Sequence, residues 1–189
     1  GKMYYFHPSL FNMMTGLWNI AGNKYYFSDN GGMETGWIEL YDGTMSYFSE
    51  TEGILTGLRV IDDQTYYFGN DGIMQTGMKN IVSSAGEQET YYFNEKGVMQ
   101  TGLIQVHDNF YYFSSTDGTR QTGWVKIGKD EYYFNLTTGA AEKGFKNIED
   151  YYYFFDPQTG KRLLGIQSQD GKIYCFNNEG DSNGLTYGW

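Results

Sequence analysis

Aromatic and polar residues recur along the chain in a pattern whose period is close to 21 residues. An aromatic triplet, usually Tyr-Tyr-Phe, is followed eight to ten residues later by a glycine. Nine such copies fill the chain, which is typical of a protein built from internal repeats. The final aromatics of the triplets are Phe6, Phe27, Phe48, Phe68, Phe93, Phe113, Phe134, Phe155 and Phe176. The glycines that follow them are Gly16, Gly36, Gly57, Gly77, Gly102, Gly123, Gly144, Gly165 and Gly184.

Each copy contains two short apolar runs separated by turn-forming residues. In residues 123–134, for example, GWVKI is followed by GKD and then by EYYF. Two short strands around Asp, Asn or Gly predict a β-hairpin, and the polar residues after each triplet predict a loop that leads to the next glycine. One copy is longer by about five residues, at residues 83–88, and its polar composition predicts an insertion at a hairpin tip.

The alternation of side chains along a strand assigns the aromatic residues to two faces. Tyr25 and Phe27 share one face, and Tyr26 points to the other. Phenylalanine at the third position carries no hydroxyl that needs a partner, so we expect this position in the core. The core residues predicted in this way are Phe27, Phe68, Phe93, Phe113 and Phe134. The middle aromatics face a groove at the solvent side: Tyr5, Tyr26, Tyr47, Tyr67, Tyr92, Tyr112 and Tyr133.

The repeat also predicts the fold class. An isolated hairpin is marginally stable in water, whereas stacked hairpins bury each phenylalanine against the next copy. We therefore predict an all-β fold, a β-solenoid of about nine stacked hairpins, forming one repeat domain over residues 1–189. The chain opens with GKMYYF, already inside the repeat, so we expect a segment of a longer protein.

Charge, hydrophobicity and cysteine content exclude several classes of partner and of structure. The net charge is −10 and the thirteen Lys and Arg are scattered, so we expect no binding to nucleic acid or to anionic lipid. No stretch approaches the ~18 apolar residues of a membrane span, and we expect no direct membrane insertion by this segment. The single cysteine, Cys175, excludes an intrachain disulfide, and we expect it to be a buried, inert thiol.

The repeat resembles a known superfamily. The stretches YYFGNDGIMQTG at residues 66–77 and YYFNEKGVMQTG at residues 91–102 are similar to cell-wall-binding repeats. They most closely resemble the short C-terminal repeats, the combined repetitive oligopeptides, of large clostridial glucosylating toxins. They resemble more loosely the choline-binding modules of pneumococcal surface proteins and the glucan-binding repeats of glucansucrases. The resemblance implies a left-handed β-solenoid that binds ligands without catalysing a reaction.

The choline-binding branch implies a cage of three aromatic rings around a quaternary ammonium, two from a W-x-Y strand and one from a Gly-Trp pair. In this sequence the three elements coincide once, at Phe110, Tyr112 and Trp124. A full ladder of such cages is not present in the sequence. Only two of the nine copies carry an aromatic three residues before the final aromatic of the triplet.

Sugar binding requires less, namely an aromatic platform with polar side chains nearby to orient the hydroxyl groups. The candidate platforms are Tyr26 with Trp37, and Phe110 or Tyr112 with Trp124. Side chains that would supply hydrogen bonds are Gln75, Gln100, Gln121 and Lys126. A glutamine before Thr-Gly has an alternative role, which is to tie its loop to the backbone.

The sequence carries no motif for catalysis, a metal or a cofactor. Neither histidine stands in a metal-binding arrangement, and there is no G-x-S-x-G or phosphate-binding loop. We therefore predict a non-enzymatic, toxin-like module of a secreted bacterial protein that binds carbohydrate on a cell surface. Two alternatives are open: recognition of choline or teichoic acid in a bacterial cell wall, and a structural or protein-binding spacer.

Overall fold

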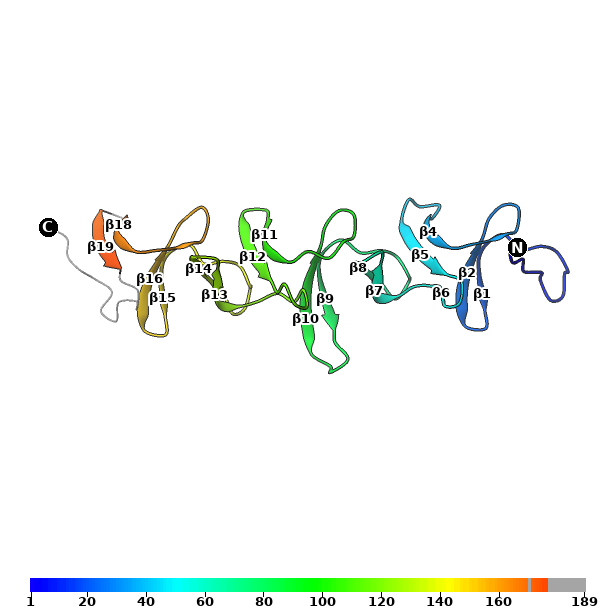
Figure 1. Ribbon diagram of the computed structural model, residues 1–189, viewed down its shortest axis with the longest axis horizontal. Coiled ribbons are helices and arrows are strands. Elements are labelled where there is room, and N and C mark those ends of the chain that lie inside the picture. The colour runs from blue at the N-terminus through cyan, green and yellow to red at the C-terminus, as the bar shows by residue number, and fades with distance from the viewer. Residues whose placement is uncertain (170, 177–189) are drawn as a thin grey trace. The chain divides into compact units, whose positions relative to one another are not determined.

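The computed structural model describes residues 1–169 and 171–176, and within them the chain is all-β (Figure 1). Of the predicted glycines, Gly184 lies outside the described residues. The longer strands are β1 (Gly16–Ile20), β2 (Asn23–Phe27), β4 (Gly36–Glu39), β5 (Met45–Ser49), β7 (Gly57–Ile61), β8 (Gln64–Phe68), β9 (Gly77–Val82), β10 (Gln88–Phe93), β11 (Gly102–Val106), β12 (Asn109–Phe113), β13 (Gly123–Ile127), β14 (Asp130–Phe134), β15 (Gly144–Ile148), β16 (Tyr151–Phe155), β18 (Gly165–Gln169) and β19 (Lys172–Phe176). Three strands of two residues complete the set: β3 (Met33–Glu34), β6 (Gly53–Ile54) and β17 (Arg162–Leu163).

The longer strands pair into eight hairpins among the described residues, one from each repeat that contains both runs. The glycine that opens a hairpin lies opposite the phenylalanine that closes it, as Gly57 lies opposite Phe68 and Gly123 opposite Phe134. The predicted hairpins are thus confirmed. Phe6 differs, because it forms only an isolated bridge with Met13.

The hairpin turns are short, and the insertion lies where the sequence predicts it. Asp62 and Asp63 form the two-residue turn between β7 and β8, and both have positive φ, at 49° and 59°. This conformation matches the right-handed twist of the flanking strands. Residues 83–87 connect β9 to β10, where the Ser83 amide donates to the Glu87 carbonyl at 2.8 Å (Figure 1).

The segment after each hairpin contains a pairing that the sequence did not predict. One residue of each predicted loop pairs with the phenylalanine that closes the hairpin, either in a two-residue strand or in an isolated bridge. We call this residue the bridge position. It is occupied by Met33, Ile54, Met74, Met99, Arg120, Ala141 and Arg162.

Backbone hydrogen bonds from the bridge position tie each hairpin to the one before it. The Met74 amide donates to the carbonyl of Met45 on β5 at 2.7 Å. The same bond joins Met33 to Met3, Met99 to Thr65, Arg120 to Thr90 and Ala141 to Phe110. In each case the acceptor lies three residues before the final aromatic of the preceding triplet. The register between successive hairpins is therefore set by the backbone as well as by side chains.

The described chain forms two compact units. The first consists of residues 1–79 and 92–99, and the second, as far as the described residues go, of residues 80–91, 100–169 and 171–176. Within each unit the hairpins follow one another through the same bridge-position bonds. The solenoid arrangement, its left-handedness and the single domain stay predictions.

The phenylalanine row forms the core, as predicted from the alternation. Phe68, Phe93, Phe113, Phe134 and Phe155 are fully buried, and Phe27 and Phe48 nearly so. The tyrosines two residues earlier share this face, and three of them are buried: Tyr66, Tyr91 and Tyr132. The middle tyrosines are half-buried, as expected for the outward face.

The prediction for Cys175 is wrong, because its thiol is exposed. It occupies the middle position of its triplet, next to Phe176 but on the opposite side of the strand. The alternation that buries Phe176 thus directs Cys175 outward. None of the described residues belongs to a helix long and apolar enough to cross a membrane.

Candidate aromatic binding sites

Trp37 is the centre of an aromatic cluster in the first unit. It lies on β4 directly after Gly36 and opposite Tyr47 of β5, with their ring centroids 5.3 Å apart and nearly perpendicular. The next hairpin contributes Tyr66, whose centroid lies 4.8 Å from that of Trp37, and Phe68, at 5.8 Å. We call these four residues the Trp37 corner. Two consecutive hairpins therefore build one site.

Trp124 forms the same arrangement in the second unit. Its ring lies 5.2 Å from Tyr133, its cross-strand partner on β14, at 71°. The following hairpin contributes Tyr153 at 4.8 Å and Phe155 at 5.9 Å. These distances match those of the Trp37 corner to within 0.1 Å. We call these four residues the Trp124 corner, and its geometry is a property of the repeat.

The sequence produces these corners through three coinciding positions. A tryptophan must follow the glycine that opens a hairpin, an aromatic must stand opposite it, and the next triplet must begin with tyrosine. Leucine or methionine replaces the tryptophan in other repeats, at Leu17, Leu58, Met78 and Leu103. Phe145 replaces it in one repeat, where its ring lies 5.0 Å from Tyr174 of the next hairpin.

The bridge position forms a further wall of each corner. In the first unit it is Met74, which packs with Trp37 and Tyr47 against the buried cluster that contains Tyr66 and Phe68. A thioether is polarizable and makes favourable contacts with aromatic rings.

In the second unit the bridge position carries a positive charge. The guanidinium carbon of Arg162 lies 5.6 Å from the ring centroid of Trp124 and 5.0 Å from that of Tyr153. Nη1 of Arg162 donates to Oε2 of Glu131 at 2.8 Å. Burial raises the pKa of Tyr153, and the charge of Arg162 opposes that rise. An aromatic corner of this shape therefore accommodates a cation over two ring faces.

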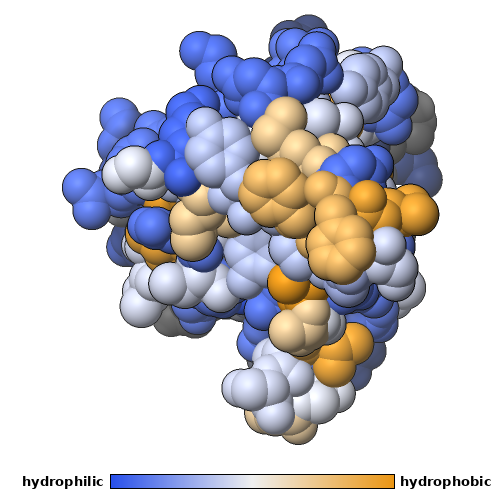
Figure 2. All heavy atoms as spheres, turned by 90° about the vertical axis from the view of Figure 1, so that its right-hand side faces the viewer, coloured by the Kyte–Doolittle hydropathy of each residue, from blue (hydrophilic) through white to orange (hydrophobic). Residues whose placement is uncertain are grey.

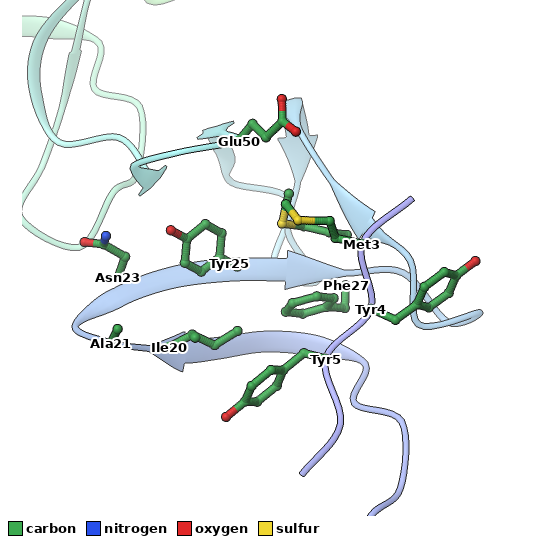
Figure 3. A pocket seen from close by; sticks show the side chains of 10 residues that line it. Met3, Tyr4, Tyr5, Ile20, Ala21, Asn23, Tyr25, Phe27 and Glu50 are labelled. Atoms are coloured by element: carbon green, nitrogen blue, oxygen red, sulfur yellow. The ribbon is translucent and has the colours of Figure 1, made fainter. Parts of the chain in front are cut away.

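A pocket of about 270 Å³ lies near the start of the first unit, shown in Figure 3. Tyr5 and Phe27 stack beside it, with centroids 6.2 Å apart, and Tyr25 projects into it from the same strand as Phe27. Glu50 contributes a carboxylate at its rim (Figure 3). We call it the Tyr5 pocket, and its lining is Met3, Tyr4, Tyr5, Ile20, Ala21, Asn23, Tyr25, Phe27, Met33 and Glu50.

The Tyr5 pocket is the counterpart of the two corners. Tyr5 takes the place of Tyr47, Tyr25 that of Tyr66, and Met33 that of Met74 in the repeat. No tryptophan is among its lining residues. Figure 2 views the molecule from the end where the chain begins, and hydrophobic side chains gather near the middle of this face among hydrophilic ones. Exposed hydrophobic residues near the start of the chain are Met3, Tyr4, Phe6, Leu10, Phe11 and Met13.

The structure groups the predicted aromatic residues differently from the sequence analysis. Trp124 contacts Tyr133 and Tyr153 rather than Phe110 and Tyr112, which lie on the preceding hairpin. Tyr112 instead lies 6.2 Å from Phe134, and Phe110 has the ammonium of Lys143 5.8 Å from its centroid. The reason is that a corner takes its second ring from the following hairpin.

Tyr26, which the sequence analysis paired with Trp37, contacts other residues in the structure. Its ring lies 5.9 Å from that of Phe48, and it stands opposite Glu34. A hydrogen bond with Tyr41, together with burial, raises its pKa. Trp37 begins the next hairpin and turns to Tyr47 and Tyr66.

Two of the predicted polar ligands have structural partners. The Gln75 side-chain amide donates to the Ile73 carbonyl at 3.0 Å, and that of Gln121 donates to the carbonyl and hydroxyl oxygens of Thr119. These bonds agree with the alternative role given above for a glutamine before Thr-Gly, which is to tie its loop to the backbone. Gln100 is half-buried beside Met99, and Lys126 lines a polar pocket with Glu131 and Arg162.

Sequence reasoning missed the tyrosines that begin each triplet, the bridge position and the Tyr5 pocket. Tyr66 and Tyr153 share a face with the core phenylalanines, which favoured a purely structural interpretation. The spacing of six or seven residues between the final phenylalanine of the triplet and the bridge residue was the available indication of its pairing. Among the described residues no group of three His, Cys, Asp or Glu side chains is arranged to hold a metal ion.

Comparison with protein families finds repeats of two related kinds. Residues 14–54 and 55–82 match the choline-binding repeat family. Residues 88–99 and 122–140 match the cell wall binding repeat family. Sequence comparison with curated proteins gives no match.

Several solved structures with a similar fold come from Streptococcus pneumoniae. Choline binding protein F aligns with 94% of this chain at 28% identity and a TM-score of 0.76, and the alignment covers 59% of that protein. In the presence of a peptidoglycan analogue, a tetrasaccharide-pentapeptide, the same protein aligns at 27% identity with a TM-score of 0.76, covering 94% of this chain and 60% of its own. CbpJ aligns at 21% identity over 95% of this chain and 84% of its own, with a TM-score of 0.72, which shows a likeness of fold alone. The chain thus spans about three fifths of the length of choline binding protein F.

Proposed function

We propose that this chain, which belongs to the cell-wall-binding and choline-binding repeat superfamily, is a non-catalytic module that binds a bacterial cell-wall polymer through its quaternary ammonium groups. The matching families favour this alternative over the toxin-like binding of cell-surface carbohydrate, and they lend no support to a link with the toxin repeats. A module with this role would act outside the bacterial cell, where the wall polymer lies.

The Tyr5 pocket is the observation that carries the proposal. A quaternary ammonium has no hydrogen-bond donor and is recognised by ring faces and by negative charge. The pocket offers the rings of Tyr5, Tyr25 and Phe27, the sulfur atoms of Met3 and Met33 in its lining residues, and the carboxylate of Glu50. Its volume of about 270 Å³ is ample for a trimethylammonium group with part of its alkyl chain.

The Trp37 corner supplies a second candidate position in the same unit. In the Trp37 corner, Trp37 and Tyr66 take the places of Trp124 and Tyr153, the two rings over which a guanidinium lies in the Trp124 corner. Met74 there replaces the charged residue. Two weak sites along one polymer chain would gain affinity through an increased effective concentration. The net charge of −10 further favours a cationic ligand.

The proposal is tested by retention on choline-substituted resin and by calorimetric titration with choline chloride. We expect wild-type protein to be retained and to be eluted by free choline. Tyr5→Leu removes a ring of the pocket, and we expect the affinity for choline there to fall about tenfold. Tyr67→Leu is the matched control, because Tyr67 stacks on Phe93 at 6.0 Å as Tyr5 stacks on Phe27.

The remaining interpretations give different results in the same assay. Binding to defined oligosaccharides on a glycan array, unaffected by free choline, would replace our proposal with the carbohydrate-binding function. A protein that is retained by neither choline resin nor glycans would favour the structural or protein-binding spacer.

A further inference from the structure

The Trp124 corner contains a cation of the chain itself. The guanidinium of Arg162 lies over two of its rings, at 5.6 Å from the centroid of Trp124 and 5.0 Å from that of Tyr153. The Arg162 side chain is only 9% exposed, so this cation is largely removed from water. A desolvated cation over two ring faces gains more than an exposed one.

One ion pair holds Arg162 in this position, and a second holds the residue before it. In the first, Nη1 lies 2.8 Å from Oε2 of Glu131, and in the second, Nζ of Lys161 lies 2.7 Å from Oδ2 of Asp130. Strand β17 is thereby attached to strand β14 of the preceding hairpin. Glu131 stands three residues before Phe134, where the choline-binding branch places an aromatic ring of its cage.

The bridge position admits different side chains without a change of backbone pairing. Met74 pairs with Phe68 as Arg162 pairs with Phe155. Arg120 also occupies a bridge position, but its guanidinium donates to the Thr138 carbonyl at 2.8 Å. The repeat before it has Met78 in place of tryptophan. An arginine at this position thus has more than one available partner.

We propose that Arg162 is a built-in occupant of the Trp124 corner, and that the residue at the bridge position determines whether a corner accepts an external quaternary ammonium. Arg162 with Glu131 closes the Trp124 corner, whereas Met74 with Met45 leaves the Trp37 corner without a cation of its own. The inference rests on the proposed choline-type ligand for the Trp37 corner. The assignment of Arg162 to the Trp124 corner can be tested separately.

The test exchanges the two bridge residues. Arg162→Met places in the second unit the residue found at Met33, Met74 and Met99, so the fold has a place for it. Met74→Arg introduces the charge into the first unit. Met74→Arg is tolerable sterically, because Met74 lies against Gly97 as Arg120, also at a bridge position, lies against Gly139. Arg162→Lys keeps the charge and serves as the matched control.

The readouts are the number of choline molecules bound, measured by calorimetry, and the ¹⁹F resonances of protein labelled with 5-fluorotryptophan. The Trp124 resonance is assigned with Trp124→Phe. We expect choline to leave this resonance unchanged in the wild type and in Arg162→Lys. In Arg162→Met, choline should shift it and the number of bound molecules should rise by one. Met74→Arg should weaken choline binding at the Trp37 corner by about tenfold.

A second variant opens the same corner without changing the bridge residue. Glu131→Gln removes the charge that holds Arg162, and choline should then shift the Trp124 resonance at high concentration. A shift of that resonance by choline in the wild-type protein would overturn the inference. An unchanged resonance in folded Arg162→Met and Glu131→Gln proteins would also overturn it.

The same measurements distinguish a failure of the proposed function from a failure of the inference about Arg162. Failure of wild-type protein to bind choline at the Tyr5 pocket and the Trp37 corner would reject the proposed function. If Arg162→Met nevertheless gained a choline-dependent Trp124 resonance, the inference about Arg162 would stand. If it gained none, both would fail.

Discussion

The amide of Met74 donates a 2.7 Å hydrogen bond to the carbonyl of Met45, and this bond joins the segment after one hairpin to the second strand of the hairpin before it. The relationship recurs at Met33, Met99, Arg120 and Ala141. Backbone bonds that connect non-neighbouring strands open only when the packing between hairpins opens. The bridge positions therefore report on cooperation between repeats.

Amide hydrogen exchange should show whether the bridge-position bonds open only when the packing between hairpins opens. We predict that the amides of Met74, Met99, Arg120 and Ala141 exchange at rates near those of the hairpin strands, although sequence analysis places them in loops. The amide of Glu95, in an exposed loop, is the control and should exchange faster by several orders of magnitude. Fast exchange at the bridge amides would mean that the hairpins open independently.

Two glycines with the same backbone conformation should differ in their response to substitution. Gly53 and Gly57 have φ values of 71° and 75°, so alanine at either position costs about 1 kcal/mol for the left-handed conformation. At Gly53 an added Cβ would also lie 2.4 Å from the Lys24 carbonyl oxygen, whereas Gly57 has open space. We expect Gly53→Ala to lower the free energy of unfolding by at least about 2 kcal/mol more than Gly57→Ala. Urea denaturation measures both, and equal losses would contradict the close contact.

Ser46 should be dispensable for stability. Its side chain is fully buried at a position where other repeats carry tyrosine, and its hydroxyl has no partner within the described part of the protein. Removing an unpaired buried hydroxyl relieves its desolvation, so Ser46→Ala should raise the free energy of unfolding by about 1 kcal/mol. In the control Ser28→Ala, loss of the hydrogen bonds to Asn30 and to the Gly32 carbonyl should destabilise the protein. A loss of stability in Ser46→Ala would indicate a bound water molecule.

Tyr91 should make stability fall at alkaline pH. Burial, together with the hydrogen bond to Glu89 and its charge, raises the pKa of Tyr91 from 10.0 to about 12. The folded state then holds the proton that the unfolded state releases, so stability is complete below pH 10 and declines as the pH rises toward 12. The loss across this window should be on the order of 2 kcal/mol. Unfolding measured from pH 9 to pH 12 should show this decline in the wild type and a smaller one in Tyr91→Phe.

The core was predictable because it depends on local alternation. A phenylalanine at the end of each triplet and a period of two along the strand suffice to bury Phe68, Phe93 and Phe134. The same rule gives the outward direction of the middle tyrosines. The same rule, applied to Cys175, gives its exposure. The prediction of a buried thiol relied instead on the general preference of cysteine for the interior.

The site was predictable only in part because its components come from two hairpins. Trp37 and Trp124 stand out in the sequence as the two Gly-Trp pairs of the repeat. Their partners Tyr66 and Tyr153 follow from the offset between successive hairpins, which depends on the bridge-position hydrogen bonds. Arg162 resembled an ordinary loop residue, since only the pairing with Phe155 places it over Trp124.

Each aromatic corner takes its tryptophan from one hairpin and its tyrosine from the next, so a single repeat carries two halves of different sites and no complete one. In evolutionary terms, the number of binding sites in such a chain changes by one at a time, at the junctions between repeats. Duplication of one repeat adds one junction, and the new junction inherits a corner only if both neighbouring halves are aromatic. The replacement of one tryptophan by leucine removes the aromatic corner at a single junction and leaves the phenylalanine row intact. The number of binding sites can therefore change along the array while the fold stays the same.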